Sequence, residues 1–375
     1  MTEKPQLREN PLDDDENEDE DERHQTDSLE YDPEKINIAT REPTIEQLLK
    51  RIDEDALDLA PDFQRKANLW DDDSKSLLIE SIIIRIPLPA FYVDATNEDQ
   101  WLVVDGLQRL TALKQFVKDK KLVLSKLDYL KELEGKTYDQ ISRKYQRRIE
   151  ETQVTVYQIE KGTPIEVKFN IFKRINTGGL PLVNQEIRHA LNPGKAIKLL
   201  ANLADSQEFT KATKFSEKRK SRMDDREFVL GFLAFTLTSY KDYQDGKRDS
   251  FLNEAMAKIN KLDDAEIDSL DKKFRKAMND AMDIFGDDVF RKIYNTKKKK
   301  KQPVNRAMFE GWSVIISHLS NSDIKLLKER QHLLRYKFGD RLEKDKMFEH
   351  SLSQAAKDIK YRFETINKLI QEVLS

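Results

Sequence analysis

Four polar or conformationally special residues, Asp105, Gly106, Gln108 and Arg109, fall within one short stretch of the chain. The guanidinium group of Arg109 is a planar fork that suits bidentate contact with phosphate oxygens. The carboxylate of Asp105 could hold Mg²⁺ or position an attacking water. Gly106 permits backbone angles that other residues avoid and lets a ligand approach the main chain. The pattern therefore indicates phosphate chemistry, with Asp105, Gln108 and Arg109 as candidate catalytic residues and Asp105 as the candidate metal ligand.

These residues lie where a predicted strand meets a predicted helix. Leu102 to Val104 form an unbroken apolar run, as expected of a strand buried on both faces. Apolar residues then recur at helical spacing from Leu110 to Val117, which predicts a helix that packs on a sheet. The N-terminus of a helix collects unpaired N–H groups and favours a phosphate. A structural alternative stays open, in which Asp105 caps this helix and Arg109 pairs with a neighbouring carboxylate.

The segments around this turn predict an α/β domain. From residue 36 to residue 118, the patterns of apolar residues give the order strand, helix, strand, helix, strand, strand, helix. Thr44 is the expected N-cap of the first helix, with Gln47 in the position of a capping box. A further strand is expected at 153–159, followed by helices at 165–175 and 184–191.

Composition limits the class of protein. The chain of 375 residues has no Cys, which excludes disulfides and thiolate zinc sites and fits a reducing cytoplasm. No apolar run approaches the roughly 20 residues that cross a bilayer, so we expect a soluble cytoplasmic protein with no membrane partner. Residues 13–22 are all acidic except Asn17, which predicts a disordered tail over 1–35. Such a tail would either keep the protein soluble or mimic nucleic acid in a basic groove.

The composition changes after Pro193 and predicts a mainly α-helical C-terminal domain over 193–375. Two basic loops are expected in this domain, at 211–222 and 297–301. Clustered cations release counterions from DNA, which favours contact with a nucleic-acid backbone. The alternative is a linker kept soluble by its charge. The candidate nucleic-acid contacts are Lys218, Arg219, Lys220, Lys297, Lys298, Lys299, Lys300 and Lys301.

Several short motifs in fixed order carry a family resemblance. They are Pro61-Asp62-Phe63-Gln64-Arg65, Trp70, Leu78-Ile79-Glu80-Ser81, Ile86-Pro87-Leu88-Pro89, Val104-Asp105-Gly106-Leu107-Gln108-Arg109-Leu110, Phe172 to Leu182, and Gln185 to Leu191. This order resembles the N-terminal domain family of GmrSD-type modification-dependent restriction endonucleases, which have a ParB/sulfiredoxin-like fold. The turn typical of that family is Asp-Gly-Gln-Gln-Arg, and this chain has Leu107 in place of the first Gln. The resemblance implies a ParB-like nucleotide-binding domain over 36–192.

The resemblance also implies a ligand and a site. It implies binding, and often hydrolysis, of a nucleoside triphosphate (NTP) with Mg²⁺, in systems that act against foreign DNA. It adds Gln64, Arg65 and Asn176 to Gly106 and Arg109 as cofactor-binding residues beside the Asp105 turn. Structural alternatives remain, because Arg65 could pair with nearby acidic residues and Asn176 could simply end a helix. Glu186 and Arg188 are possible partners of the residues that line this site, without direct contact to the ligand.

Three hypotheses on function follow from these patterns. The first is an NTP-hydrolysing sensor or regulator of a bacterial restriction or anti-phage system, and the second is a DNA-binding adaptor that hydrolyses nothing. The third, a DNA-nicking endonuclease, is disfavoured because the sequence has no His-Asn-His or other legible nuclease motif. The sequence also has no Walker-type phosphate loop, so a nucleotide would have to bind in another way. The expected partners are DNA and an NTP, while an effector nuclease and a homo-oligomeric partner remain open.

Overall fold

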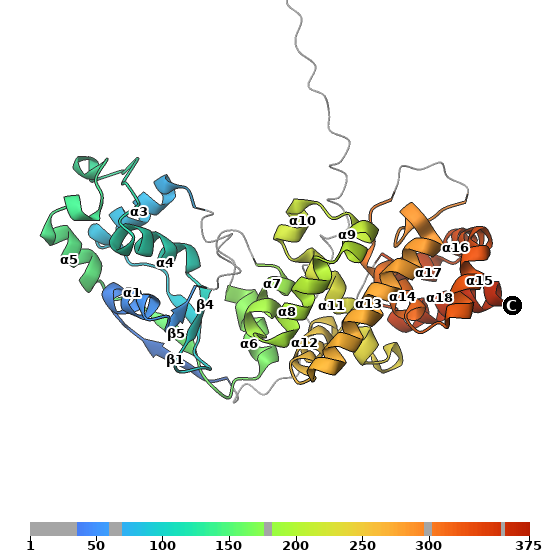
Figure 1. Ribbon diagram of the computed structural model, residues 1–375. Helices are drawn as coiled ribbons and strands as arrows, with labels where there is room; N and C mark the ends of the chain where they lie inside the picture. Colours follow the sequence, from blue (N-terminus) through green and yellow to red (C-terminus); the bar gives the residue numbers. More distant parts are fainter. Residues whose placement is uncertain (1–35, 60–69, 176–181, 296–301, 354–356) are drawn as a thin grey trace, which may run out of the picture. The chain divides into compact units, whose positions relative to one another are not determined.

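The computed structural model describes residues 36–59, 70–175, 182–295, 302–353 and 357–375 (Figure 1). The predicted acidic tail therefore lies outside the described residues, as do Gln64, Arg65, Asn176 and the lysines 297–301. The chain divides into two compact units, whose described parts cover 36–183 and 184–375. The helix at 184–191 is thus grouped with the second unit, whereas the composition change in the sequence comes after it.

The first unit is built on a mixed sheet of five strands. In the order β1-β5-β3-β4-β2, the neighbours pair antiparallel, parallel, antiparallel and parallel. The strands are β1 (Ile38–Arg41), β2 (Leu57–Asp58), β3 (Phe91–Asp94), β4 (Trp101–Asp105) and β5 (Val156–Ile159). The predicted α/β class and the predicted order of elements from 36 to 118 are both confirmed.

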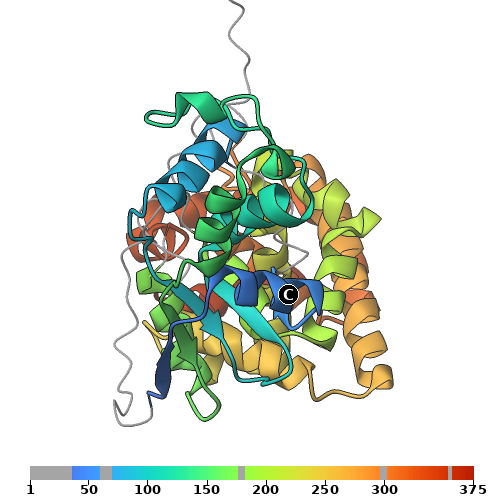
Figure 2. The same ribbon diagram turned by 90° about the vertical axis from the view of Figure 1, so that its left-hand side faces the viewer.

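Helices cover one face of this sheet (Figure 2). They are α1 (Ile45–Asp53), α3 (Asp72–Ile83), α4 (Leu107–Leu113), which continues as the π-helical turn η4 (Lys114–Lys118), and α5 (Arg143–Glu151). Thr44 and Gln47 form the predicted capping box of α1, and Asp71 caps α3 by accepting from the Ser74 N–H at 2.8 Å. Phe91, Val93 and Val103 are buried in the core under these helices. The next helix, α6 (Ile165–Ile175), contacts β4, and its Lys168 pairs with Asp94 of β3 at 2.9 Å.

A buried carboxylate fixes the long connection between α4 and α5. This connection contains only two short 3₁₀ turns, η5 (Lys131–Leu133) and η6 (Tyr138–Gln140). Glu80 of α3 accepts hydrogen bonds from three successive N–H groups, those of residues 128, 129 and 130, at 2.9, 2.8 and 2.7 Å. Burial by itself would raise the pKa of Glu80, but these three bonds lower it below the usual value. The charge of Glu80 therefore holds an otherwise irregular segment in place.

The second unit is entirely helical in the part that the structure describes, as predicted. Among those residues, no helix is both long and apolar enough to cross a membrane. The helices are α7 (Asn184–Leu191), α8 (Lys195–Ala204), α9 (Gln207–Thr213), α10 (Glu217–Ser221), α11 (Asp224–Leu237), α12 (Arg248–Ile259), α13 (Asp264–Phe285), α14 (Arg306–Ile316), α15 (Asn321–Glu329), α16 (Gln331–Lys344), α17 (Lys346–Ser351) and α18 (Ile359–Leu374), with 3₁₀ turns η7 (Tyr240–Asp242) and η8 (Gly286–Asp288).

One expectation for this unit needs correction. The basic stretch 211–222 is not a loop, because Ser206 and Ser216 cap the short helices α9 and α10, which contain most of it. Arg330 separates α15 from α16. The Arg330 side chain donates to the carbonyl of Val373 near the end of α18, at 2.5 Å. This tertiary contact accompanies the break, and periodicity alone does not reveal it.

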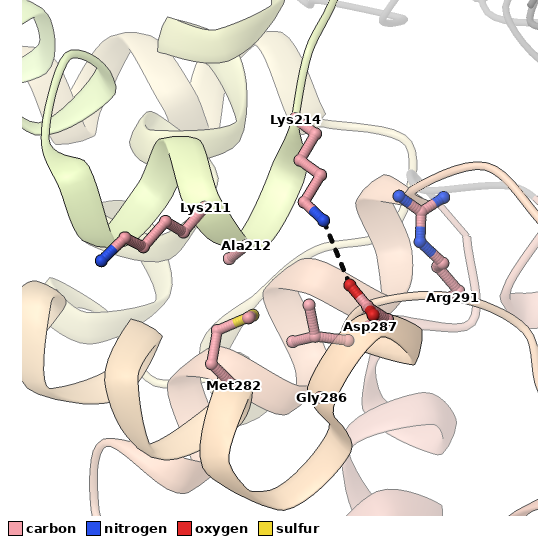
Figure 3. Close-up of a pocket in the computed structure, with 8 residues that line it drawn as sticks. Lys211, Ala212, Lys214, Met282, Gly286, Asp287 and Arg291 are labelled. Atoms are coloured by element: carbon pink, nitrogen blue, oxygen red, sulfur yellow. Dashed lines mark hydrogen bonds and ion pairs between the residues drawn. The ribbon is translucent and has the colours of Figure 1, made fainter.

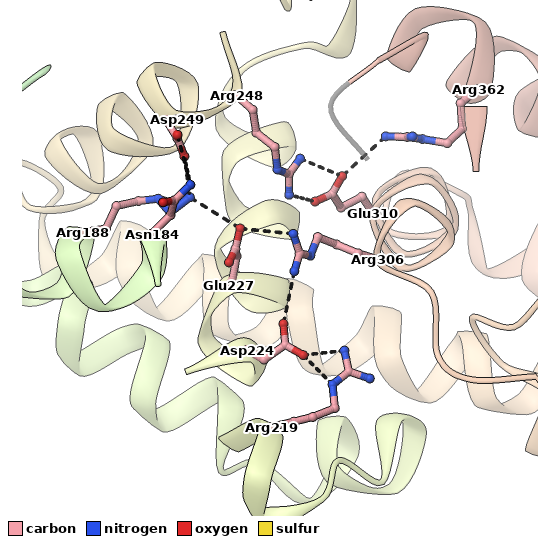
Figure 4. A network of polar contacts seen from close by, with 10 residues as sticks. All are labelled: Asn184, Arg188, Arg219, Asp224, Glu227, Arg248, Asp249, Arg306, Glu310 and Arg362. Carbon is pink, nitrogen blue, oxygen red and sulfur yellow. Dashed lines mark hydrogen bonds and ion pairs between the residues drawn. The ribbon is translucent and has the colours of Figure 1, made fainter. Parts of the chain in front are cut away.

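Buried charges join the helices of the second unit (Figure 4). Glu227 of α11 lies 3.5 Å from Arg188 of α7 and 3.4 Å from Arg306 of α14. Burial would raise the pKa of Glu227, but the arginines Arg306, Arg188 and Arg248 lower it to about 2. Glu310 of α14 accepts two hydrogen bonds from Arg248 and lies 3.6 Å from Arg362 of α18. Each of these carboxylates thus compensates arginines from separate helices.

We expect Glu310→Leu to lower the free energy of unfolding by about 3–5 kcal/mol, because removal of one partner leaves buried charge uncompensated. The Glu310 and Arg362 side chains are both fully buried. Urea denaturation measures the effect. Asp264→Asn is the control, since its ion pair with Lys195 is largely exposed and its loss should hardly change stability. Equal stability of the two variants would contradict a structural role for Glu310.

Candidate functional site

A β-bulge determines where the side chain of Asp105 lies. Val93 pairs with Val103, but the preceding residue Tyr92 pairs with Asp105, so Val104 is an extra residue in β4. Strict alternation would place Asp105 on the same face as the buried Val103. Residues directly opposite each other in an antiparallel pair share a face, so the bulge brings Asp105 beside Tyr92 instead. The side chain of Asp105 is consequently 28% exposed.

Gly106 forms the corner between β4 and α4. It has φ of 98° and ψ of 7°, in the left-handed region that favours glycine. A Cβ atom at this position would lie 2.3 Å from Cδ1 of Phe91, well inside the contact distance. Gly106 is also the N-cap residue of α4, which has no side-chain cap, so Asp105 does not cap this helix as the structural alternative proposed. Glycine is therefore required both by the backbone and by the packed aromatic ring.

Arg109 points inward and binds the main chain as well as Asp105. Its Nη2 donates to Asp105 Oδ2 at 2.9 Å and to the Ala90 carbonyl at 3.1 Å, while Nη1 donates to the Pro89 carbonyl. The guanidinium also lies over the ring of Phe91, 4.4 Å from its centroid. Burial lowers the pKa of Arg109, and the carboxylate of Asp105 partly offsets this effect. In this arrangement, both terminal nitrogens of Arg109 contact protein oxygens and position Asp105.

Gln108 connects the turn to the segment that precedes α3. Its Oε1 accepts a hydrogen bond from the N–H of Trp70 at 3.4 Å. Trp70 is the first described residue after the segment that contains Gln64 and Arg65, which itself lies outside the described residues. The predicted proximity of Gln64, Arg65 and Asn176 to Asp105 thus stays a prediction.

Two paired tyrosines, of which Tyr92 lies next to Asp105, are functional candidates that the sequence reasoning missed. Tyr92 of β3 and Tyr157 of β5 pair directly in the parallel ladder, and their ring centroids are 5.0 Å apart at an interplanar angle of 30°. Burial raises the pKa of Tyr92, and Tyr157 and Asp105 raise it further. The alternation of side chains along β3 could have placed Tyr92 on the opposite face from the buried Phe91 and Val93. The bulge that aligns Tyr92 with Asp105, however, has no clear sequence signal.

Two other residues singled out in the sequence, Glu186 and Arg188, belong to the helical unit. Glu186 and Arg188 are fully buried in the helical unit, where Arg188 pairs with Asp249 at 3.1 Å, so their described contacts support that unit. These contacts do not support the expectation that Glu186 and Arg188 contact the residues of the Asp105 turn.

The basic residues of α10 differ in what they contact. Arg219 pairs with Asp224 and lies over the Phe215 ring at 4.1 Å, so this predicted nucleic-acid contact is engaged in packing. Lys220 pairs with Glu217 at 2.9 Å. Contact of Lys218 and Lys220 with nucleic acid stays a prediction.

A small polar hollow lies in the helical unit, between α9 and the end of α13 (Figure 3). It is lined by Lys211, Lys214 and Arg291, and Lys214 pairs with Asp287 at 3.1 Å. The charged lining is mostly positive. Among the residues that the structure describes, no group of three or more His, Cys, Asp or Glu side chains could hold a metal ion. Bound phosphates and water could supply the other ligands of a metal at Asp105, which is how Mg²⁺ is commonly held beside one or two carboxylates.

Comparison with known proteins gives one match. A family described as GmrSD restriction endonuclease, N-terminal domain, matches residues 45–192. The matched region runs from α1 to the end of α7 and contains the whole Asp105 turn. Neither the curated proteins nor the solved structures contain a significant match to the chain.

We expect Gly106→Ala to lower the free energy of unfolding by about 2–5 kcal/mol, the sum of a strained backbone and an overpacked ring. Gly162→Ala is a matched control, because Gly162 has φ of 100° but nothing lies within 4 Å of the place that a Cβ atom would take. That control should lose only the backbone part, about 1–2 kcal/mol. Urea denaturation followed by circular dichroism distinguishes the two. Equal losses would show that the Phe91 ring moves aside at no cost.

Proposed function

Because residues 45–192 match the GmrSD restriction endonuclease, N-terminal domain family, we propose that the chain is a nucleotide-dependent component of a restriction system that acts on DNA. The observation that supports a nucleotide role is the Asp105 turn, in which one partly exposed carboxylate is held by a buried guanidinium. We further propose that the domain binds an NTP with Mg²⁺ and hydrolyses it.

In this proposal, Asp105 and Arg109 have different tasks. Asp105 supplies the carboxylate that holds Mg²⁺ or positions the attacking water. Arg109 acts through Asp105, because its terminal nitrogens already contact the carbonyls of Pro89 and Ala90. The bound metal would neutralise charge on the phosphate oxygens. The direct phosphate contacts would then come from Gln64, Arg65 and Asn176, on the strength of the sequence motifs alone.

A non-hydrolysing adaptor is the second candidate. The inward direction of Arg109 favours the adaptor, since a guanidinium that is hydrogen-bonded to the main chain cannot also bind a phosphate in the same geometry. In that case, the nucleotide would act as a structural ligand. Nucleotide binding without release of phosphate would identify this candidate.

We expect Asp105→Asn to lower Mg²⁺-dependent phosphate release by roughly 100-fold or more, since it removes the charge that holds the metal or the water. Release of phosphate from each of the four ribonucleoside triphosphates measures this change. Asp119→Asn is the matched control, because it also removes a partly buried carboxylate from an ion pair, here with Lys114 at 2.8 Å. Equal turnover by Asp105→Asn and wild type would show that Asp105 is not part of the catalytic site.

DNA contact by the second unit is a separate part of the proposal. Replacement of Lys297, Lys298, Lys299, Lys300 and Lys301 by Gln should weaken binding to unrelated duplexes alike. It should also flatten the dependence of log affinity on log salt, by roughly 0.9 for each phosphate that the variant no longer neutralises. Mobility-shift titrations at several salt concentrations measure both quantities. The control variant makes the same change of net charge at five exposed lysines elsewhere in the unit: Lys198, Lys258, Lys325, Lys346 and Lys360. Equal effects of the two variants would contradict a specific role for the run.

A further inference from the structure

A row of four side chains crosses the sheet at the level of the Asp105 turn. Thr40 of β1 pairs with Tyr157 of β5, Tyr157 pairs with Tyr92 of β3, and Tyr92 pairs with Asp105 of β4. Directly paired residues share a face of the sheet, so all four lie on the face opposite to the buried Phe91. The row is therefore continuous from an exposed threonine to the candidate catalytic carboxylate.

The exposure of this row differs from that of the rest of the sheet. Tyr92, Tyr157 and Asp105 are each partly exposed, and Thr40 is exposed. Further along the same face, Ile159 is fully buried, and Asp94 is engaged by Lys168 of α6. The described structure thus covers one end of this face and leaves two adjoining aromatic rings partly accessible at the other end.

We propose that Tyr92 and Tyr157 form a platform on which the base of a bound nucleotide stacks, with the phosphates directed to the Asp105 turn. The two rings stack on each other, with centroids 5.0 Å apart, so a bound base would extend this stack on an outer ring face. Stacking accepts any base, since every base has a π face. Adjacent strands lie about 4.8 Å apart, so β5 and β4 are separated by roughly 10 Å across the sheet. A nucleotide that spans this distance would reach from the tyrosines to Asp105.

This inference deepens the proposed nucleotide-binding function and rests on it for the orientation of the phosphates. The competing account is that the two rings contribute only cross-strand packing. The two accounts differ in one measurable respect, because packing affects every ligand alike, whereas a stacking platform affects only ligands that carry a base. The same base could come from a free nucleotide or from single-stranded nucleic acid.

The experiment compares Tyr157→Ala and Tyr157→Phe with wild type by isothermal titration calorimetry. The probes are the four ribonucleoside triphosphates and, as a ligand with phosphates but no base, inorganic tripolyphosphate. We expect Tyr157→Ala to weaken nucleotide binding roughly 10- to 100-fold and to leave tripolyphosphate binding unchanged. Tyr157→Phe, which keeps the ring, should bind as wild type does. Tyr240→Ala is the matched control, because Tyr240 stacks on Phe363 in the helical unit, with centroids 4.7 Å apart.

A second arm separates the platform from the proposed function. It uses a short single-stranded oligothymidylate and an abasic oligonucleotide of the same length. One possible result is that wild type binds no triphosphate, binds oligothymidylate through Tyr157, and binds the abasic strand less tightly. This result would support the stacking platform and contradict the NTP function. The platform is overturned if Tyr157→Ala leaves the affinities for nucleotides and oligothymidylate unchanged. It is also overturned if the variant weakens tripolyphosphate binding equally, or if wild type binds none of these probes.

Discussion

The contact between Arg109 and the start of β3 is the constraint on which the Asp105 turn depends. A buried guanidinium must find acceptors for its N–H groups, and here the carbonyls of Pro89 and Ala90 supply them together with Asp105. One side chain therefore fixes the approach to β3, the end of β4 and the first turn of α4. The carboxylate of Asp105 neutralises the charge that this arrangement buries, so the candidate catalytic group is also part of the fold.

The two units solve the problem of buried charge in different ways. In the first unit, the charges of Arg109 and Glu80 are satisfied largely by main-chain groups, and each organises a segment near it in space. In the second unit, carboxylates on α11 and α14 compensate arginines that come from other helices. Such pairs add little stability beyond that of a well-packed apolar core, but their geometry matches particular helices to one another. The helical arrangement is thus specified by charge as well as by apolar packing.

The sequence predicts much of the first unit because its signals are local. The capping box at Thr44, the apolar run in β4 and the amphipathic pattern after Gly106 each determine an element within a few residues. The site is less predictable, because the roles of its residues depend on tertiary partners. Arg109 has the chemistry of a phosphate ligand, and only the positions of Pro89, Ala90 and Phe91 show that it faces inward. In the same way, Arg188 pairs with Asp249 far along the chain, and Arg219 pairs with Asp224 of the adjoining helix. The charge of these two arginines alone therefore suggested exposed or site-facing roles.

The bulge at Val104 makes the register of β4 against β3 more important than the identity of its apolar residues. Many apolar residues would fill Val103 and Val104 equally well, since the core requires volume and little else at these positions. A regular strand with the same number of residues would instead pair Val104 with Tyr92 and turn Asp105 toward the buried face. Related chains can therefore exchange the apolar side chains of this strand freely while they keep Asp105 opposite Tyr92. Comparison by apolar similarity alone would overlook this register, which positions the carboxylate.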